Sequence, residues 1–175
     1  MAEENTSLVE ECMRQSKNCL YTAASFTEWL RCLKTFRTIC LVCPLVFGAL
    51  ATWKIIEQNS PILAAVFALI AATITPIYLT LKVDEAISQY SDLAGEFTNL
   101  RDAFRREAGF WKDKSADEFR LAIAPLLERL EKARSHTLTP PRRFFRKAAK
   151  QIAEGVYDDD PAAKSRAARA AAAPN

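Results

Sequence analysis

Two apolar runs lie in the middle of the chain. The longer run extends from Pro61 to Leu81 and contains 21 residues without a charged side chain. At a rise of about 1.5 Å per residue, a helix of this length covers the ~30 Å hydrocarbon core of a bilayer. The pattern therefore predicts a membrane-spanning helix over residues 61–81.

The earlier apolar run extends from Thr38 to Trp53 and contains 16 uncharged residues. It reaches residue 56 if Lys54 extends its amine to the lipid headgroups beside Trp53. We therefore expect a first span over residues 38–56. The alternative is a pair of buried helices in a soluble core. It is disfavoured because so small a chain offers little other protein to cover both helices.

A short polar link at residues 57–60 separates the two runs, so the helices must be antiparallel neighbours. Basic side chains flank the outer ends of the pair: Arg31, Lys34, Arg37 and Lys82. The link has only Lys54 beside it, so the positive-inside rule predicts that both termini are cytoplasmic. The acidic N-terminus lacks the features of a cleavable signal peptide, and the first span is expected to act as an uncleaved anchor.

Small residues in both runs offer close helix contacts. They are Gly48 and Thr52 in the first run, and Ala65, Ala68 and Ala72 on one face of the second. Such spacings favour helix packing in lipid, either within the hairpin or between subunits. The centres of the two runs contain no ionisable side chain, which argues against a proton relay, a voltage sensor or a charged selectivity ring.

Heptad seams precede the first run and follow the second. The positions on the first seam are Cys12, Ser16, Cys19, Ala23, Phe26, Leu30 and Leu33; those on the second are Val83, Ile87, Tyr90, Ala94, Phe97, Leu100 and Phe104. Steps of four and three residues indicate long helices with a coiled-coil type of apolar stripe. Because the hairpin makes them antiparallel, the seams are expected to pack on each other as a helical stalk, or to mate between subunits.

A further helix is predicted over residues 116–135. Ser115 and Glu118 have the spacing of a capping box, and the apolar positions are Phe119, Ile123, Leu126, Leu127 and Leu130. Pro125 is expected to bend or split this helix.

Pro140 and Pro141 then open a short helix that ends at Gly155. It contains a basic and aromatic cluster: Arg142, Arg143, Phe144, Phe145, Arg146, Lys147 and Lys150. This cluster could contact anionic lipid, nucleic acid or a second-messenger phosphate. It could equally be a solvated face with Phe144 and Phe145 packed on the stalk.

The composition predicts an almost entirely helical chain, since it has only four glycines and is rich in good helix formers. The predicted fold class is an all-α membrane protein, a two-helix transmembrane hairpin with long cytoplasmic helices. We expect a cytoplasmic helix over 1–37, the hairpin over 38–82, a cytoplasmic helical region over 83–155 and a disordered or weakly helical tail over 156–175. The net charge of +3 is too small to indicate a partner.

The sequence offers no catalytic constellation. It has no phosphate-binding glycine loop, paired zinc cysteines or metalloprotease motif, so no enzyme activity, metal or cofactor is expected. The cysteines, Cys12, Cys19, Cys32, Cys40 and Cys43, are odd in number, and a disulfide framework is not expected. Cys40 and Cys43 are interpreted as packing residues, His136 as a histidine without a partner, and the acidic run Asp158, Asp159 and Asp160 as solvated.

The order of these parts resembles the SLATT family over residues 15–155. The resemblance rests on an aromatic-bearing first helix, the paired spans, the second seam and the basic helix, at Tyr21, Trp29, Tyr90, Leu93, Phe97, Leu100, Phe104 and Arg143. Members of that family are small bacterial membrane proteins encoded with second-messenger synthases and SLOG sensors in defence systems. They are regarded as effectors that assemble in the inner membrane and breach it.

The resemblance implies a pore-forming antiviral effector that forms homo-oligomers in the bacterial inner membrane. Thr73 and Thr80 would be the most water-compatible pore lining, although their hydroxyls can also bond to their own helix. The basic cluster would contact a nucleotide or lipid phosphate. The expected partners are the bilayer, further copies of the chain, and a cyclic nucleotide or a sensor protein; DNA is not expected. Two alternatives remain, a membrane-anchored adaptor that recruits a soluble partner and a subunit of a larger membrane enzyme or transporter.

Overall fold

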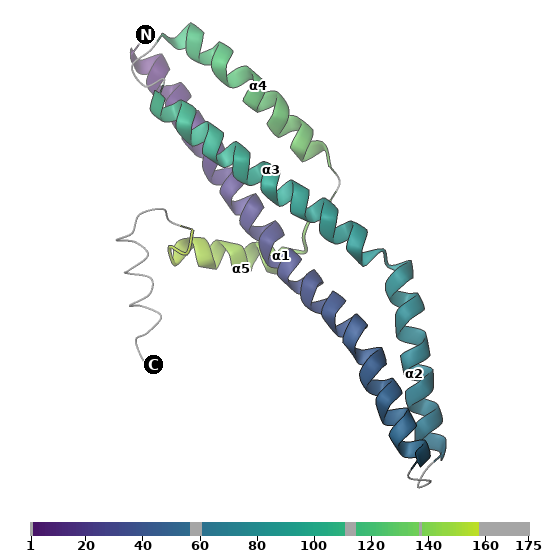
Figure 1. The fold of residues 1–175 in the computed structure, drawn as a ribbon. Coiled ribbons are helices and arrows are strands. Elements are labelled where there is room, and N and C mark those ends of the chain that lie inside the picture. Colours follow the sequence, from purple (N-terminus) through teal and green to yellow (C-terminus); the bar gives the residue numbers. More distant parts are fainter. Residues whose placement is uncertain (1, 57–60, 111–114, 137, 158–175) are drawn as a thin grey trace, which may run out of the picture. The chain divides into compact units, whose positions relative to one another are not determined.

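The structure, a computed structural model, describes residues 2–56, 61–110, 115–136 and 138–157. The regular secondary structure of these residues is entirely helical, as the composition predicts. The helices are α1 (Ala2–Ile56), α2 (Pro61–Thr80), α3 (Val83–Phe110), α4 (Ala116–Ser135) and α5 (Arg142–Ala153), as shown in Figure 1. The predicted polar link at 57–60 and the acidic run and tail from 158 onward lie outside the described residues.

The chain forms two compact units. Unit 1 combines Met1–Trp29 with Tyr90–Asn175, and unit 2 is Leu30–Gln89. Both α1 and α3 therefore contribute residues to both units. Unit 2 includes the two apolar runs together with several residues on each side of the predicted 38–82 segment.

The core of unit 1 is built from the two predicted seams. In α1 the buried seam residues are Cys12, Ser16, Cys19, Ala23 and Phe26, and in α3 they are Ala94, Phe97, Leu100 and Phe104. The Phe26 ring lies 5.7 Å from Tyr90 and 5.8 Å from Phe97 between centroids. The Ser16 hydroxyl donates to the Arg101 carbonyl at 3.0 Å. These contacts confirm that the seams pack on each other within one chain.

Helix α4 completes this core. Its N-cap forms as predicted, because the Ser115 hydroxyl accepts from the Glu118 amide at 3.3 Å. The buried side chains of α4 are Phe119, Ile123, Leu130 and Ala133. Arg129 makes a bidentate pair with Glu96 of α3 at 2.9 and 3.1 Å. The helix is continuous through Pro125, so of the two expected effects of this proline, a bend or a split, the split does not occur.

Helix α5 follows Pro141 and ends at Ala153, two residues before the glycine that the sequence indicated. Gly155 has a φ of 76°, a conformation that glycine adopts without a steric penalty. Its amide donates to the Ile152 carbonyl, and the Val156 amide donates to the Gln151 carbonyl, both at 3.0 Å. These bonds satisfy carbonyls in the last turn and close the helix.

Unit 2 contains a helical hairpin in which α2 runs antiparallel to residues 30–56 of α1 (Figure 1). Its contact face contains the buried residues Ala51 and Ala64, and the rings of Phe47 and Phe67 stack at 5.9 Å. At the other end of α2, Lys82 adopts a φ of 47°. This left-handed residue separates α2 from α3.

Candidate functional site

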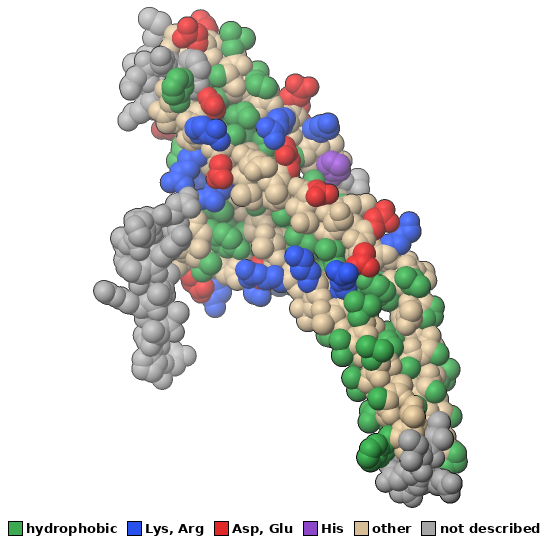
Figure 2. All heavy atoms as spheres, viewed as in Figure 1, with side chains coloured by type: hydrophobic (Ala, Val, Ile, Leu, Met, Phe, Trp, Pro, Cys, Tyr) green, Lys and Arg blue, Asp and Glu red, His purple; other side chains and the backbone are tan. Residues whose placement is uncertain are grey.

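The apolar surface of unit 2 is the most prominent feature of the described chain. By length and composition, α1 and α2 could each cross a membrane. Only 6% of the most apolar 18 residues of α1 and 11% of those of α2 are buried. Leu45 is 74% exposed and Ile62 is 76% exposed. Figure 2 shows hydrophobic side chains over the hairpin, so this surface has no protein covering within the described chain.

The predicted small residues do not form the contact face of the hairpin. Gly48 is half-buried, and a side chain added there would meet nothing within 4 Å. Ala65, Ala68 and Ala72 are exposed. The sequence left open two uses for this alanine face, packing within the hairpin and packing between subunits. The structure leaves the face uncovered, so it is available to another molecule.

Three threonines in the hairpin, Thr52, Thr73 and Thr80, satisfy their hydroxyls locally. Thr52 donates to the Gly48 carbonyl at 3.0 Å, Thr73 to Ile70 at 3.0 Å and Thr80 to Pro76 at 2.8 Å. All three side chains are exposed on the surface of the hairpin. Their hydroxyls can therefore face lipid without an unmade hydrogen bond, and each oxygen can still accept a bond from water.

A polar contact that the sequence analysis did not find joins three helices of unit 2. Asp84, in the first turn of α3, accepts a hydrogen bond from the Tyr78 hydroxyl of α2 at 2.5 Å. The same carboxylate pairs with Arg37 Nε of α1 at 2.9 Å. The helix dipole alone already accounts for an acidic residue in a first helical turn. The sequence therefore gave no sign that Asp84 also has two side-chain partners.

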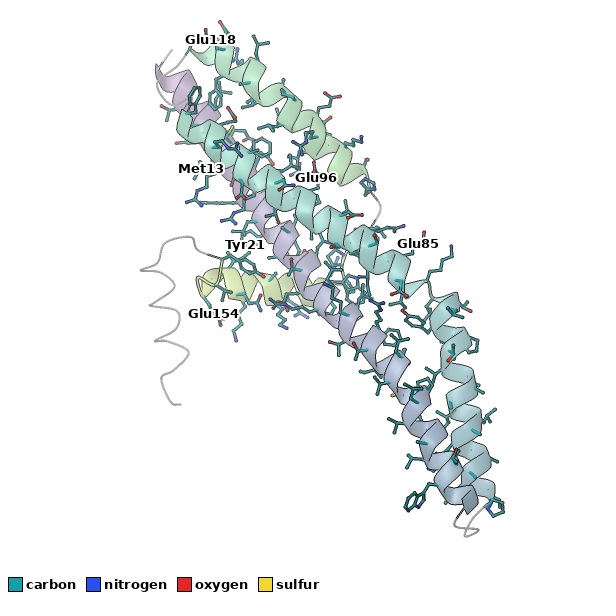
Figure 3. All side chains as sticks on the ribbon, viewed as in Figure 1. Met13, Tyr21, Glu85, Glu96, Glu118 and Glu154 are labelled. Carbon is teal, nitrogen blue, oxygen red and sulfur yellow. The ribbon has the colours of Figure 1, made fainter. Side chains whose placement is uncertain are left out.

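Helix α5 packs its aromatic side on α1. Phe144 is buried, with its ring 4.9 Å from that of Trp29, and the Arg143 guanidinium lies 4.7 Å from the Phe144 centroid. Phe145 is exposed on one side and stacks on Tyr21 at 6.4 Å. Figure 3 labels Tyr21 on α1 and Glu154 just after α5. The aromatic half of the predicted cluster is therefore part of the packing of unit 1.

The basic half of the cluster divides into two groups. Lys147 Nζ lies 2.7 Å from the Glu28 carboxylate, whose side chain is 0% exposed. Arg142, Arg143, Arg146 and Lys150 have exposed side chains, and Lys150 lies 3.8 Å from Glu154. Only these four remain as an outward-facing cationic surface, because Lys147 is engaged by α1. Sequence analysis missed Glu28, since nothing along the chain distinguishes it from a solvent-facing glutamate.

The remaining candidate residues are the cysteines and His136. All five cysteines are free thiols on α1, with Cys40 and Cys43 half-buried. Burial raises the pKa of Cys12 and of Cys19 from 9.0 to about 11. His136 is exposed directly after α4. Among the described residues, no group of three or more His, Cys, Asp or Glu side chains is arranged to hold a metal ion.

Comparisons with known proteins give no relative from which a role could be transferred. No family model matches the chain, and no curated protein and no solved structure matches it.

Proposed function

We propose that this chain is a membrane effector of a bacterial defence or conflict system, whose hairpins assemble in the inner membrane and permeabilise it. The observation that carries the proposal is the exposed apolar surface of unit 2. Soluble proteins rarely leave an apolar surface of this length uncovered, and a bilayer is the solvent that covers two adjacent helices of about 20 residues. The low burial of both helices also disfavours the core of a soluble domain.

The ends of the hairpin support a transmembrane orientation with cytoplasmic termini. Arg31, Lys34 and Arg37 are exposed before the apolar part of α1, and Lys82 is exposed after α2. Trp53 is exposed at the opposite end of the hairpin. Basic residues prefer the cytoplasmic side, and tryptophan prefers the interface between membrane and water.

Assembly between copies is supported by the uncovered alanine face. Ala65, Ala68 and Ala72 allow the backbones of neighbouring helices to approach closely in lipid. Thr73 and Thr80 lie on the exposed surface of the same helix and offer oxygens that water can reach in an assembled pore. In this proposal the hairpin supplies the pore and unit 1 controls assembly.

The resemblance to the SLATT family supports the effector function and indicates how the signal arrives. A cyclic nucleotide or a sensor protein would act on unit 1, and the exposed cations of α5 are candidates for a nucleotide or lipid phosphate. No catalytic step is required, because the response comes from oligomerisation of the hairpins. The competing function is an adaptor that uses the hairpin only as an anchor.

The test follows membrane potential and propidium iodide entry during induced expression, together with dye release from liposomes that contain the purified chain at high density. The informative variant is Ala68→Leu with Ala72→Leu, which adds bulk to the alanine face while keeping the helix apolar. Leu63→Phe is the matched control, because Leu63 is also exposed on α2 but by helical spacing lies on neither the alanine face nor the face of Thr73 and Thr80.

We expect depolarisation and dye release with the wild-type chain and with the control. Both signals should fall by about tenfold or more in the double variant. Membrane fractionation should show that all three chains insert equally. If the wild-type chain inserts but causes neither depolarisation nor dye release, the effector function is wrong and the adaptor function is favoured.

A further inference from the structure

Helix α5 carries a row of cations on the side away from its packing contacts. Successive residues of an α-helix are rotated by about 100°, so these cations share an arc of about 100° around the helix axis. The buried Phe144 and Ala148 lie on the opposite side of α5, toward the core of unit 1. We call this exposed row the cationic stripe; its members are Arg142, Arg143, Arg146 and Lys150.

The cationic stripe has little counter-charge. Among the described residues, Arg142, Arg143 and Arg146 have no ion-pair partner, and α5 itself contains no Asp or Glu. Lys150 lies 3.8 Å from Glu154, where both side chains are largely exposed and the pair is weak. The buried Glu28 pairs with Lys147, which is not part of the stripe. The stripe is therefore a positively charged surface open to solvent.

The start of α5 is unfavourable for the two arginines that occupy it. The N-terminus of a helix carries a partial positive charge, so cations in the first turn are disfavoured. Arg142 and Arg143 nevertheless open α5, and the first turn contains no acidic residue. The ring of Phe144, 4.7 Å from the Arg143 guanidinium, offsets part of this repulsion for Arg143 alone. An anion outside the helix would be attracted both by the arginines and by the helix terminus.

The stripe lies on the outer surface of a helix. Cavities of about 360 and 230 Å³ between the helices of unit 1 are lined by other residues. Small phosphate ligands are usually enclosed by the walls of a pocket. An exposed row of cations on an amphipathic helix instead suits an extended anionic plane, such as the headgroup layer of a bilayer.

The chain itself keeps α5 close to a bilayer. Helix α5 packs on α1 through Phe144, whose ring lies 4.9 Å from that of Trp29. Trp29 precedes Thr38, the first residue of the predicted first span, by nine residues. Nine residues reach at most about 30 Å even when fully extended. With the hairpin inserted, the local concentration of headgroups around α5 is therefore high, and individually weak charge contacts suffice for docking.

We propose that the cationic stripe docks on anionic phospholipid headgroups of the leaflet that faces the chain termini. The inference rests on the membrane-spanning hairpin of the proposed function, and it names the partner of the exposed cations of α5. The contact is electrostatic and is made by the side of α5 that faces away from α1. Lys147 takes no part in it, because its amine is paired with Glu28.

The experiment uses the full chain in phosphatidylcholine nanodiscs with increasing fractions of phosphatidylglycerol. A fluorescent amino acid, dansylalanine, takes the place of Ala153, which is exposed at the end of α5 and by helical spacing lies on the side of the stripe. A phosphatidylcholine with a nitroxide on its headgroup quenches this fluorophore when α5 lies at the bilayer surface. Retention of the chain on the discs during gel filtration reports insertion of the hairpin separately.

The test variant removes three cations of the stripe by Arg142→Gln, Arg146→Gln and Lys150→Gln. The control variant removes three exposed cations from α1, α3 and α4 instead, by Lys17→Gln, Arg106→Gln and Lys132→Gln. Both variants have the same net charge, so only the location of the lost charges differs. Equal helix content by circular dichroism shows that the fold is retained.

Quenching should rise with the phosphatidylglycerol fraction in the wild-type chain and in the control. Each cation near an anionic surface favours docking by about fivefold, so the test variant should lose about a hundredfold in the docking equilibrium. Its quenching should stay near the value in pure phosphatidylcholine. High salt should reduce the wild-type response, because it screens exposed charges.

Three outcomes would overturn the proposal. If the discs retain the chain without quenching that depends on phosphatidylglycerol, or if the control loses as much as the test variant, the inference is wrong while the membrane function stands. If the chain does not stay on the discs, the membrane function fails as well. A labelled RNA oligonucleotide, titrated onto the same discs, tests the competing occupant: RNA binding without a response to phosphatidylglycerol would assign the stripe to nucleic acid.

Discussion

Lys147 of α5 forms an ion pair with Glu28 of α1 at 2.7 Å, and the glutamate side chain is completely buried. The lysine side chain is 59% exposed, so the pair spans the boundary between the core of unit 1 and solvent. A buried carboxylate without a partner is costly, and the lysine amine offsets part of that cost while α5 is docked. The ion pair therefore links the docking of α5 to the solvation of a residue on α1.

Substitution of Lys147 by Ala should destabilise unit 1 by about 1–3 kcal/mol, because the Glu28 carboxylate loses its partner on α5 while it stays buried. Thermal unfolding followed by circular dichroism measures this loss. Adding Glu28→Gln to the variant should restore much of the stability, since a neutral amide costs less to bury than a carboxylate.

The control on the same helix is Lys150→Ala. Lys150 lies 3.8 Å from Glu154, and both side chains are largely exposed, so the expected change is within about 0.5 kcal/mol. An equal effect of the two substitutions would mean that the burial of Glu28 has no energetic role.

Phe104 is fully buried where α3 packs in unit 1. Phe104→Ala should lower the free energy of unfolding by about 3–5 kcal/mol, through lost apolar burial and the cavity left behind. Phe110→Ala is the matched control on the same helix, because Phe110 is 63% exposed. Its expected cost is below about 1 kcal/mol. Denaturant titration of both variants compares them, and similar midpoints would contradict the core described for unit 1.

The thiols of Cys12 and Cys19 should respond to alkaline pH. Burial raises the pKa of each thiol from 9.0 to about 11, so the unfolded chain loses these protons at lower pH than the folded chain. Their contribution to stability is complete below about pH 9 and is lost as the pH rises toward 11.

Unfolding midpoints measured from pH 8 to pH 11 test this expectation, with Cys12→Ala and Cys19→Ala together as the control that should flatten the decline. At pH 8 a maleimide reagent should label both thiols only when the chain is unfolded. Rapid labelling of both thiols in the folded chain would show that they are accessible.

Asp84→Asn should weaken unit 2 by about 1–2 kcal/mol, since the carboxylate accepts from Tyr78 and pairs with Arg37. The Arg37 and Asp84 side chains are about half exposed, which limits the value of their ion pair. Glu85→Gln is the control at the next position. Among the contacts described for Glu85, the one outside α3 is an exposed ion pair with Lys82 at 3.4 Å. Apparent melting temperatures in detergent should fall for Asp84→Asn and stay near the wild-type value for Glu85→Gln.

The helices and the seams of unit 1 could be predicted from the sequence because helical periodicity records burial directly. Phe97, Leu100 and Phe104 recur at steps of three and four residues, as Phe26 does with Ala23 and Leu30 in the first seam, so the buried face of each helix is determined by the pattern. The structure confirms the contact of Phe26 with Phe97. The N-cap at Ser115 could also be predicted, since capping is a local interaction.

The contact face of the hairpin could not be predicted in the same way. In α2 nearly every residue is apolar, so the pattern carries no contrast between the face toward α1 and the face toward lipid. The alanine face was therefore a candidate for packing within the hairpin, whereas Ala64 and Phe67 make that contact. Glu28 was missed for a different reason: its partner Lys147 is distant in the sequence, and pairwise electrostatics between distant residues leave no periodic signal.

The division of unit 1 between two distant parts of the chain has a consequence for biosynthesis. Residues before Leu30 leave the ribosome first, but Tyr90 and Phe97, the partners of Phe26 on α3, follow only after all of Leu30–Gln89 has been made. Until then the first seam has no partner helix to pack on. Closing the loop formed by residues 30–89 costs conformational entropy, and this cost is smaller if the two ends of the loop are already close. Formation of the hairpin brings those ends together, so the apolar segments should pair before the core of unit 1 can form.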